Sequence, residues 1–305
     1  MQKVWTPLCG QLGIDYPIFG FAHDIATVAA ITNAGGYGVY GATRRFPDEI
    51  REELALIRSL VGDKPFGVDL VLPPGMPEHN SREAIEADIS EEHKSFVAGL
   101  IEKYQVPPAS GPGMRTRFIR SSEIEEAQIQ AVLESSVNMF ACGIGAPPEV
   151  LRRAKALGKT TLALIGSPHH VQRAVAAGVD MLVAQGYDAG AHTGPIGTYS
   201  LVPQIVDAAG EVPVLVAGGV ATGRHVAAGL AMGAAGVWIG TAWLLSEEHQ
   251  AHMHPVNTEK LKAAGSGDTV ITRSESGKTF RQVRSSWSQE WESENAPKPL
   301  KMPYQ

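Results

Sequence analysis

The sequence predicts one α/β domain, a closed (β/α)8 TIM barrel with an insertion at the C-terminal face of its strands and a C-terminal extension. Its 305 residues exceed the roughly 250 residues that such a barrel occupies. A unit recurs in which an amphipathic segment ends at a glycine, a short apolar run follows, and a second glycine ends that run. The apolar runs do not alternate with polar residues, which is typical of parallel strands covered on both faces.

The recurring unit is clearest at 33–41, 177–186 and 232–240, where a glycine after each amphipathic segment supplies a left-handed C-cap. Applied along the chain, this pattern predicts eight strands, the number that closes such a barrel: 16–20, 37–41, 66–71, 137–142, 160–165, 181–184, 214–217 and 237–239. Helical periodicity between the strands predicts helices at 24–34, 48–61, 123–134, 148–157, 168–177, 201–209 and 222–232.

Two segments fall outside the repeating pattern. The third and fourth strands are too far apart for one crossover, so 73–122 is predicted to be an insertion near the active-site mouth, with a polar, turn-rich start and a helix at 91–104. The barrel would then comprise 1–72 and 123–245. Residues 246–305 form the predicted extension, part of a lid, with a helix at 256–264 and exposed tryptophans at 287 and 291 that either mark a partner surface or fold back on the barrel.

Composition argues against several classes of protein. The net charge of −6 arises from acids and bases spread along the chain, so we expect no nucleic-acid partner. Cys9 and Cys142 are too few for a disulfide framework or a thiolate metal cage, which favours a reducing, cytoplasmic location. No apolar run approaches about 18 residues, so no membrane segment is expected. We expect no metal site either, because the histidine-rich 247–254 has no ligating partner at suitable spacing and reads as a solvated loop.

Two glycine pairs follow the predicted seventh and eighth strands. In parallel barrels the loops after these strands often bind a phosphate, and Gly218-Gly219 and Gly240-Thr241 stand there. Glycine lets the main chain approach a ligand, and the N–H groups offer partial positive charge. Tight turns alone would explain either pair, but together they favour a phosphorylated ligand.

Two polar residues follow the predicted sixth strand. Gln185 carries a neutral amide that can both donate and accept at the edge of a heterocycle such as a flavin. His192 lies seven residues further on in a glycine-rich loop, and an imidazole can transfer protons in either direction near neutrality. A lone histidine is usually structural, but this position favours a catalytic role. Other motifs are weaker: 143–148 reads as a βα turn capped by proline, Cys142 as a small buried hydrophobe, and His169-His170 as a helix start.

With these residues in place, the chain resembles the nitronate monooxygenase family, also called 2-nitropropane dioxygenase-like, whose members are FMN-dependent barrels. The resemblance is carried by 17–22, 34–36, 66–70, 183–194, 213–219 and 237–241. It implies that His192 is the catalytic histidine. It further implies that FMN contacts the backbone of Gly20, Phe21 and Ala22. Asp69 and Gln185 would contact the polar edge of its ring, and Gly190 would lie against the ring. The residues around the ribityl phosphate would be Gly218, Gly219, Trp238, Ile239, Gly240 and Thr241.

Three positions depart from the family pattern. The usual Glu-Ala-Gly-Gly-His reads Asp188-Ala-Gly-Ala191-His192, so a methyl group stands where glycine is common and the acid is shorter. Position 69, often Asn, is Asp, which if ionised would oppose an anionic reduced flavin. These changes bear on substrate and rate more than on FMN binding. The tail at 299–305 resembles a point where relatives continue into further helices, so we expect the chain to be cut short or to lack part of a lid.

The resemblance implies oxidation of alkyl nitronates by FMN and O2 to a carbonyl compound and nitrite, with small-molecule partners and a possible homodimer. His192 would bind the nitro group or take the α-proton of a neutral nitroalkane. Three alternatives remain: an NAD(P)H-dependent reductase of quinones or enoyl thioesters on the same site, a flavin-free sugar-phosphate isomerase or lyase, and a catalytically silent binding module.

Overall fold

The computed structural model describes residues 4–78, 81–111, 113, 117–302 and 304–305. Parts of the predicted insertion, 79–80, 112 and 114–116, and Pro303 of the tail lie outside the described residues. The chain divides into two compact units, 1–74 with 126–263 and 75–125 with 264–305. The first unit holds the barrel, and it includes 246–263, which the sequence analysis assigned to the extension.

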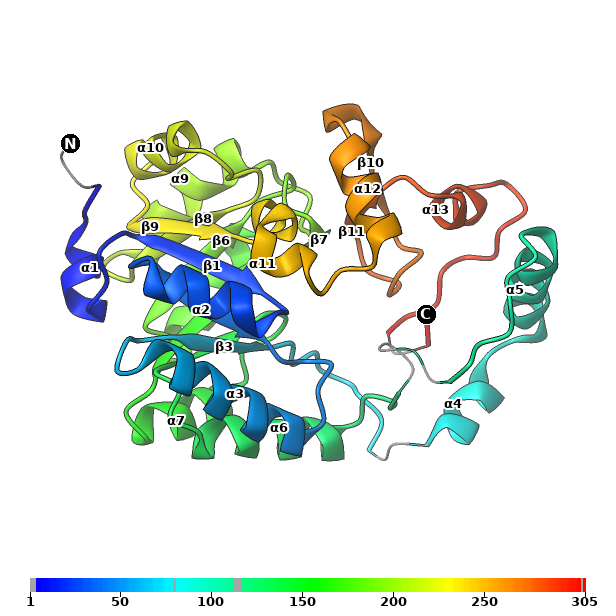
Figure 1. Ribbon diagram of the computed structural model, residues 1–305, viewed down its shortest axis with the longest axis horizontal. Coiled ribbons are helices and arrows are strands. Elements are labelled where there is room, and N and C mark those ends of the chain that lie inside the picture. Colours follow the sequence, from blue (N-terminus) through cyan, green and yellow to red (C-terminus); the bar gives the residue numbers. More distant parts are fainter. Residues whose placement is uncertain (1–3, 79–80, 112, 114–116, 303) are drawn as a thin grey trace. The chain divides into compact units, whose positions relative to one another are not determined.

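The first unit is a closed barrel of eight parallel strands, which confirms the predicted fold class (Figure 1). Its strands, in order around the barrel, are β1 (Ile18–Ala22), β2 (Tyr37–Gly41), β3 (Gly67–Leu70), β4 (Met139–Cys142), β5 (Thr160–Ile165), β6 (Met181–Gln185), β8 (Val214–Ala217) and β9 (Gly236–Ile239).

Helices follow the barrel strands and cover the outside of the barrel (Figure 1). In chain order they are α2 (Ile25–Asn33), α3 (Pro47–Val61), α6 (Ser122–Glu134), α7 (Pro148–Ala156), η1 (Pro168–His170) with α8 (Val171–Ala176), α9 (Thr198–Ala209) and α10 (Gly223–Ala231). The unit also contains α1 (Pro7–Leu12), the short strand β7 (Ala191–His192), η2 (Thr241–Leu245), α11 (Glu247–Gln250) and α12 (Pro255–Ala263).

Local chemistry explains where a typical helix of this set starts and stops. The carboxylate of Asp24 accepts a hydrogen bond from the backbone N–H of Thr27 at 2.7 Å and so caps the start of α2. Gly35, just after the end of α2, has φ of 91°, a left-handed conformation that turns the chain into β2. The buried residues of α3 recur at helical spacing, at Ile50, Leu54, Ile57 and Val61, so one stripe of that helix packs on the barrel.

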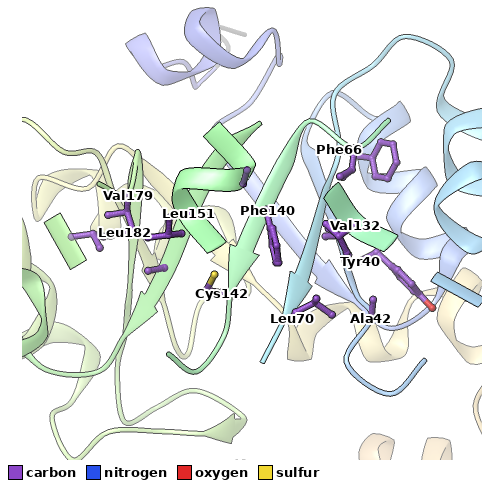
Figure 2. Close-up of a cluster of buried hydrophobic side chains, with 14 of the residues drawn as sticks. Tyr40, Ala42, Phe66, Leu70, Val132, Phe140, Cys142, Leu151, Val179 and Leu182 are labelled. Carbon is purple, nitrogen blue, oxygen red and sulfur yellow. The ribbon is translucent and has the colours of Figure 1, made fainter. Parts of the chain in front are cut away.

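Two buried clusters form the core of the barrel unit, and strand alternation separates them. Phe19, Val39, Met139 and Val183 belong to the cluster inside the barrel. Residues one position along, such as Phe140 and Leu182, belong to the layer between strands and helices, part of which Figure 2 shows. Cys142 lies in that outer layer and is buried, as the sequence analysis expected of a small hydrophobe. Every second strand residue therefore points into the barrel.

The strand β1 is displaced from its predicted position by two residues. The sequence analysis placed this strand at 16–20, whereas pairing starts at Ile18 and continues to Ala22. The backbone N–H groups of Asp15 and Tyr16 both donate to the carbonyl of Gly35, and Pro17 has no N–H. The ladder can therefore begin only after these residues, and Phe21 and Ala22, which lie beyond the predicted strand, are strand residues like Gly20.

Three other predictions need correction. The helix expected at 201–209 begins at Thr198, because the carboxylate of Asp188 accepts from the Thr198 N–H at 2.8 Å, a cap from ten residues away. The histidine-rich segment read as a solvated loop contains α11, whose residue His249 is half-buried. The prediction that Trp291 is exposed is wrong, since only 6% of it is accessible.

The second unit contains α4 (Arg82–Asp88), α5 (Glu91–Lys103), η3 (Ser266–Asp268), the antiparallel pair β10 (Thr269–Thr272) and β11 (Phe280–Val283), and α13 (Ser286–Trp291). The Trp291 ring lies 5.0 Å from Phe96 and 5.6 Å from Trp287. His93 of α5 contacts the Lys298 carbonyl through Nε2 at 2.8 Å. The aromatic cluster and this hydrogen bond join the inserted helices to the C-terminal segment, although the two are far apart in sequence.

Among the described residues, no helix combines the length and apolarity needed to cross a bilayer.

Asp180, just before β6, gives the fold a testable dependence on pH. Its carboxylate accepts from the Thr161 N–H at 2.8 Å, from the Thr161 hydroxyl at 2.7 Å and from Lys155 Nζ at 2.8 Å. Partial burial raises the pKa of Asp180, but the hydrogen bonds from Lys155 and Thr161 outweigh it, so the net pKa is lowered. A lowered folded pKa means that the ionised carboxylate stabilises the fold above its unfolded pKa, about 3.9, and that this contribution is lost as pH falls through the folded value.

We predict that Asp180→Asn lowers the free energy of unfolding by about 1 kcal/mol at pH 7, because hydrogen bonds to a charged group become bonds to a neutral amide. The deficit should shrink as the pH falls below about 4. Urea titrations at several pH values measure it. Asp207→Asn, an exposed carboxylate on α9, is the matched control. A deficit that is the same at pH 3 and pH 7 would show that the charge of Asp180 does not matter.

Candidate active site

Parallel pairing brings the C-terminal ends of all eight barrel strands to one rim, where the predicted site residues gather. Alternation then decides which of them face inward. Phe21 packs with the interior cluster, and Asp69 lies one position from the outward Val68 and Leu70. Gln185 lies two positions beyond the inward Val183. The inner side of the rim therefore carries an aromatic ring, a buried carboxylate and an amide.

The glycine pair after β8 adopts a backbone conformation that glycine favours. Gly218 and Gly219 have φ of 101° and 73°. A Cβ at Gly218 would lie 2.7 Å from the Thr198 hydroxyl oxygen and 3.0 Å from the Ala189 nitrogen, so no side chain fits there. At Gly219 the nearest atom would be the Asp188 Cβ at 3.4 Å. Packing therefore accounts for Gly218, whereas Gly219 has more open surroundings.

The second glycine segment follows β9. Gly240 is the residue between β9 and the 3-10 helix η2, which begins at Thr241 and which the sequence analysis missed. A Cβ at Gly240 would meet no atom closer than the Phe21 Cδ1 at 3.8 Å, and a Cβ at Gly190 would lie 2.7 Å from the Thr241 hydroxyl oxygen. The loop after β6 and the end of β9 are therefore neighbours. A short helix after the last strand is a recurring part of barrel phosphate sites.

Gln185 and His192 are joined directly. The side-chain Nε2 of Gln185 donates a hydrogen bond to the backbone carbonyl of His192. Because a carbonyl only accepts, the NH2 group of Gln185 faces His192. One N–H of the amide is thus committed to holding the histidine backbone, and its oxygen and second N–H remain for other partners.

The loop between β6 and α9 is held at several points. Ala191 has φ of 65°, which explains why glycine is common at this position in the family that the sequence resembles. The Asp188 carboxylate, in place of the usual glutamate, caps α9, and the Tyr187 N–H donates to the Ile196 carbonyl at 2.7 Å. These bonds fix the backbone that carries His192.

The predicted FMN contacts on β1 and β9 lie within the strands. Gly20 packs towards the helices, because a Cβ there would lie 2.4 Å from Ile31 and 2.9 Å from Trp243. Ala22 and Ile239 also belong to the outer layer. The Phe21 ring stacks on Trp238 at 5.9 Å, inside the barrel. Of these residues, the Phe21 and Trp238 rings lie on the inner side.

Asp69 is a buried carboxylate at the rim, and only 4% of the residue is exposed to solvent. A Cβ at Gly143, just past β4, would lie 3.1 Å from its Oδ1, so glycine leaves room for the carboxylate. Gly143 begins the βα turn that ends in Pro148, the first residue of α7, as the sequence indicated. His169 and His170 are exposed residues of η1.

His23 is a rim residue that the sequence analysis did not single out. It follows β1 directly, and its Nδ1 lies 2.8 Å from the carbonyl oxygen of Gly41, at the end of β2. Its ring meets Phe21 edge-on, with centroids 5.0 Å apart. The signal in the sequence was a histidine just past a strand, which the two-residue displacement of β1 concealed.

Comparisons with known proteins agree with this architecture. The family model described as nitronate monooxygenase matches residues 7–305. A protein of Mycobacterium tuberculosis named as a monooxygenase is 40% identical, over 98% of this chain and 82% of that relative. One from Staphylococcus saprophyticus, named as a nitronate monooxygenase, is 32% identical over 92% of this chain and 79% of the relative.

Solved structures give the same result. Nitroalkane oxidase from Streptomyces ansochromogenes has a TM-score of 0.73 at 26% identity, and the matched region covers 96% of this chain and 82% of the nitroalkane oxidase chain. FabK from Thermotoga maritima has a TM-score of 0.72 at 27% identity, and the matched region covers 94% of this chain and 77% of the FabK chain. The chain therefore belongs to the nitronate monooxygenase family of flavin-dependent oxidoreductases.

Proposed function

We propose that this chain binds FMN at the C-terminal rim of its barrel and oxidises alkyl nitronates with O2 to carbonyl compounds and nitrite. The observation that carries the proposal is the bond between Gln185 and His192 beside two glycine segments open to a ligand. It joins a group suited to the edge of a flavin to a group suited to the substrate.

The residues present fit a ribityl phosphate. Gly219 and Gly240 have few atoms where a side chain would stand, so a ligand can approach their main chain. Their N–H groups, with the Thr241 hydroxyl at the start of η2, would hold the phosphate as hydrogen-bond donors. Gly218 would shape this turn rather than touch the ligand. The adjoining Gly190 would leave space for the ring.

Residues of the inner rim fit the isoalloxazine. The free oxygen and N–H of Gln185 would pair with its polar edge, and Phe21 would lie against its apolar part. Asp69 would face the same edge. Gly20, Ala22, Trp238 and Ile239 would contribute to FMN binding only indirectly. They shape strands β1 and β9, and β1 carries Phe21 while β9 leads into Gly240.

The division of chemistry follows from this placement. FMN would supply the electron acceptor for the nitronate. His192 would donate a hydrogen bond to a nitronate oxygen and so orient the substrate, with its backbone held by Gln185. O2 is the second substrate. One alternative is an NAD(P)H-dependent reductase on the same site, which differs from the proposed function in the compound that reduces the flavin.

We predict that His192→Asn lowers kcat/KM for ethylnitronate by about 10- to 150-fold, the loss of one hydrogen bond to a charged group of roughly 1.5–3 kcal/mol. FMN content should not change. Oxygen consumption and flavin absorbance measure these two quantities.

Anaerobic stopped-flow reduction by ethylnitronate, NADH and NADPH separates the two flavin chemistries. We expect ethylnitronate to bleach the flavin fastest. Faster bleaching by either pyridine nucleotide would favour the reductase, and a colourless protein that fails to bind added FMN would contradict both.

Gly240 offers a test of the phosphate site that spares the fold. Its φ of −118° suits any residue, and an added Cβ meets only Phe21, at ordinary contact distance. Gly240→Ala should therefore leave the stability of the apoprotein unchanged while weakening FMN binding about tenfold or more, which is about 1.4 kcal/mol. Fluorescence titration of apoprotein with FMN measures it. Gly223→Ala, whose Cβ would meet nothing within 4 Å, is the control. Equal affinities of both variants would exclude close approach of FMN to Gly240.

The backbone strain at Ala191 also predicts a measurable effect. A left-handed alanine costs roughly 1 kcal/mol relative to glycine, so Ala191→Gly should raise the free energy of unfolding by a few tenths to about 1 kcal/mol. Ala228→Gly, on the exposed side of helix α10, should lower it by about 1 kcal/mol. Urea unfolding of both variants is the measurement. A loss of stability in Ala191→Gly would mean that the methyl group contributes packing that outweighs the strain.

A further inference from the structure

The second unit contains a cavity of about 340 Å³, lined by the β10–β11 hairpin, the end of α13 and the C-terminal segment. Every residue of the lining belongs to 264–305, so the cavity lies within one compact unit. Its volume falls in the range of small-molecule binding sites. None of the residues proposed above to hold FMN belongs to its lining, so it is a separate candidate site.

Hydrogen bonds to the buried Ser274 hold the surroundings of this cavity together. The carbonyl of Ser274 accepts from the Trp287 indole at 3.3 Å and from the Gln305 amide at 3.0 Å, and its N–H donates to the Thr272 hydroxyl at 3.0 Å. Its hydroxyl oxygen accepts from the Gln282 amide at 3.2 Å. Specific polar contacts therefore fix the hairpin, α13 and the C-terminal segment around the cavity.

Two side chains of opposite charge line the cavity. Arg273 follows β10 directly, and Glu292 follows the last residue of α13. Both are exposed to solvent, and within the described part of the chain neither side chain forms a hydrogen bond or an ion pair. A guanidinium only donates and an ionised carboxylate only accepts. A ligand that carries both a carboxylate and an ammonium group therefore satisfies the two residues together.

The cavity also has an apolar wall. Ile271 and Pro299 contribute aliphatic surface, and the ring of Trp291, of which only 6% is accessible, contributes aromatic surface. An inorganic ion would leave this wall in contact with water, whereas an apolar side chain covers it. The lining therefore combines a group for a carboxylate, a group for an ammonium ion and a surface for an apolar side chain.

We propose that this cavity binds a free α-amino acid with an apolar or aromatic side chain. Arg273 donates two parallel hydrogen bonds to the carboxylate, which its planar guanidinium favours. Glu292 accepts from the ammonium group, and Trp291 packs against the side chain. A ligand with one charge fits less well, because an anion is repelled by Glu292 and a cation by Arg273. This site does not depend on the function proposed for the barrel, since no residue is shared.

Three ligands that differ in one charged group each test this assignment on the full chain with FMN added. L-Phenylalanine carries both charges, 3-phenylpropionate lacks the ammonium group, and phenethylamine lacks the carboxylate. In ligand-observed NMR titrations we expect a Kd for L-phenylalanine below about 1 mM, and binding of each analogue about fivefold weaker or more. Absence of L-phenylalanine binding up to about 10 mM, or equal or tighter binding of either analogue, would overturn the proposal.

Variants of the two charged residues assign each ligand group to its partner. Arg273→Gln should weaken binding of L-phenylalanine and 3-phenylpropionate about fivefold or more and leave phenethylamine unchanged, whereas Glu292→Gln should weaken L-phenylalanine and phenethylamine and spare 3-phenylpropionate. Lys278→Gln and Glu294→Gln are the matched controls, because they remove the same charges from exposed residues that do not line the cavity. Equal losses in the cavity and control variants would place the ligand elsewhere and overturn the proposal.

Neither replacement should disturb the fold, because both side chains are exposed and make no side-chain bonds within the described residues. Thermal unfolding of each variant checks this expectation. If a variant unfolds early, the comparison of the three ligands on the unaltered chain still decides the proposal. Oxidation of ethylnitronate, measured on the same samples, tests the proposed function separately, since its absence would leave the amino-acid site unaffected.

Discussion

Parallel hydrogen bonding around a closed ring of eight strands is the constraint on which the rest of this structure depends. It forces every carboxyl end to one rim, and the two-residue period of a strand then divides side chains between the interior and the helix layer. Phe21, Asp69 and Gln185 come from three strands that are far apart in sequence, yet each lies on the inner side of that rim. The site follows from the register of the barrel, because a slip of one residue would turn all three outward.

The loops above the rim are fixed by bonds that compensate for strain. Ala191 keeps a left-handed backbone that an alanine disfavours, and it persists because its surroundings determine it from several sides. Gln185 holds the carbonyl of His192, while Asp188 binds the first N–H of α9. The shorter acid therefore retains a structural task even though it differs from the usual glutamate. These polar contacts position the backbone of His192.

Local pattern was sufficient for the barrel but not for details that depend on distant contacts. Strands β2, β5 and β8 begin and end where the apolar runs meet glycine, proline or polar residues. The start of β1 depends on the Gly35 carbonyl, and the start of α9 depends on Asp188; neither partner is a sequence neighbour. The glycine pairs and His192 were found because their types are informative. His23 and the core role of Trp291 became visible only when the partner segments were in place.

The orientation of each ring nitrogen distinguishes the histidines of this chain better than their position does. His93 uses both nitrogens, one with Ser90 and one with the Lys298 carbonyl, which makes it a structural link. His225 accepts at Nδ1 from the N–H groups of Ala221 and Thr222 and closes the start of α10. His23 uses Nδ1 to fix its ring, and its side chain remains exposed at the rim. His23 therefore differs from these two histidines, because one ring nitrogen holds its orientation while the residue stays exposed at the rim.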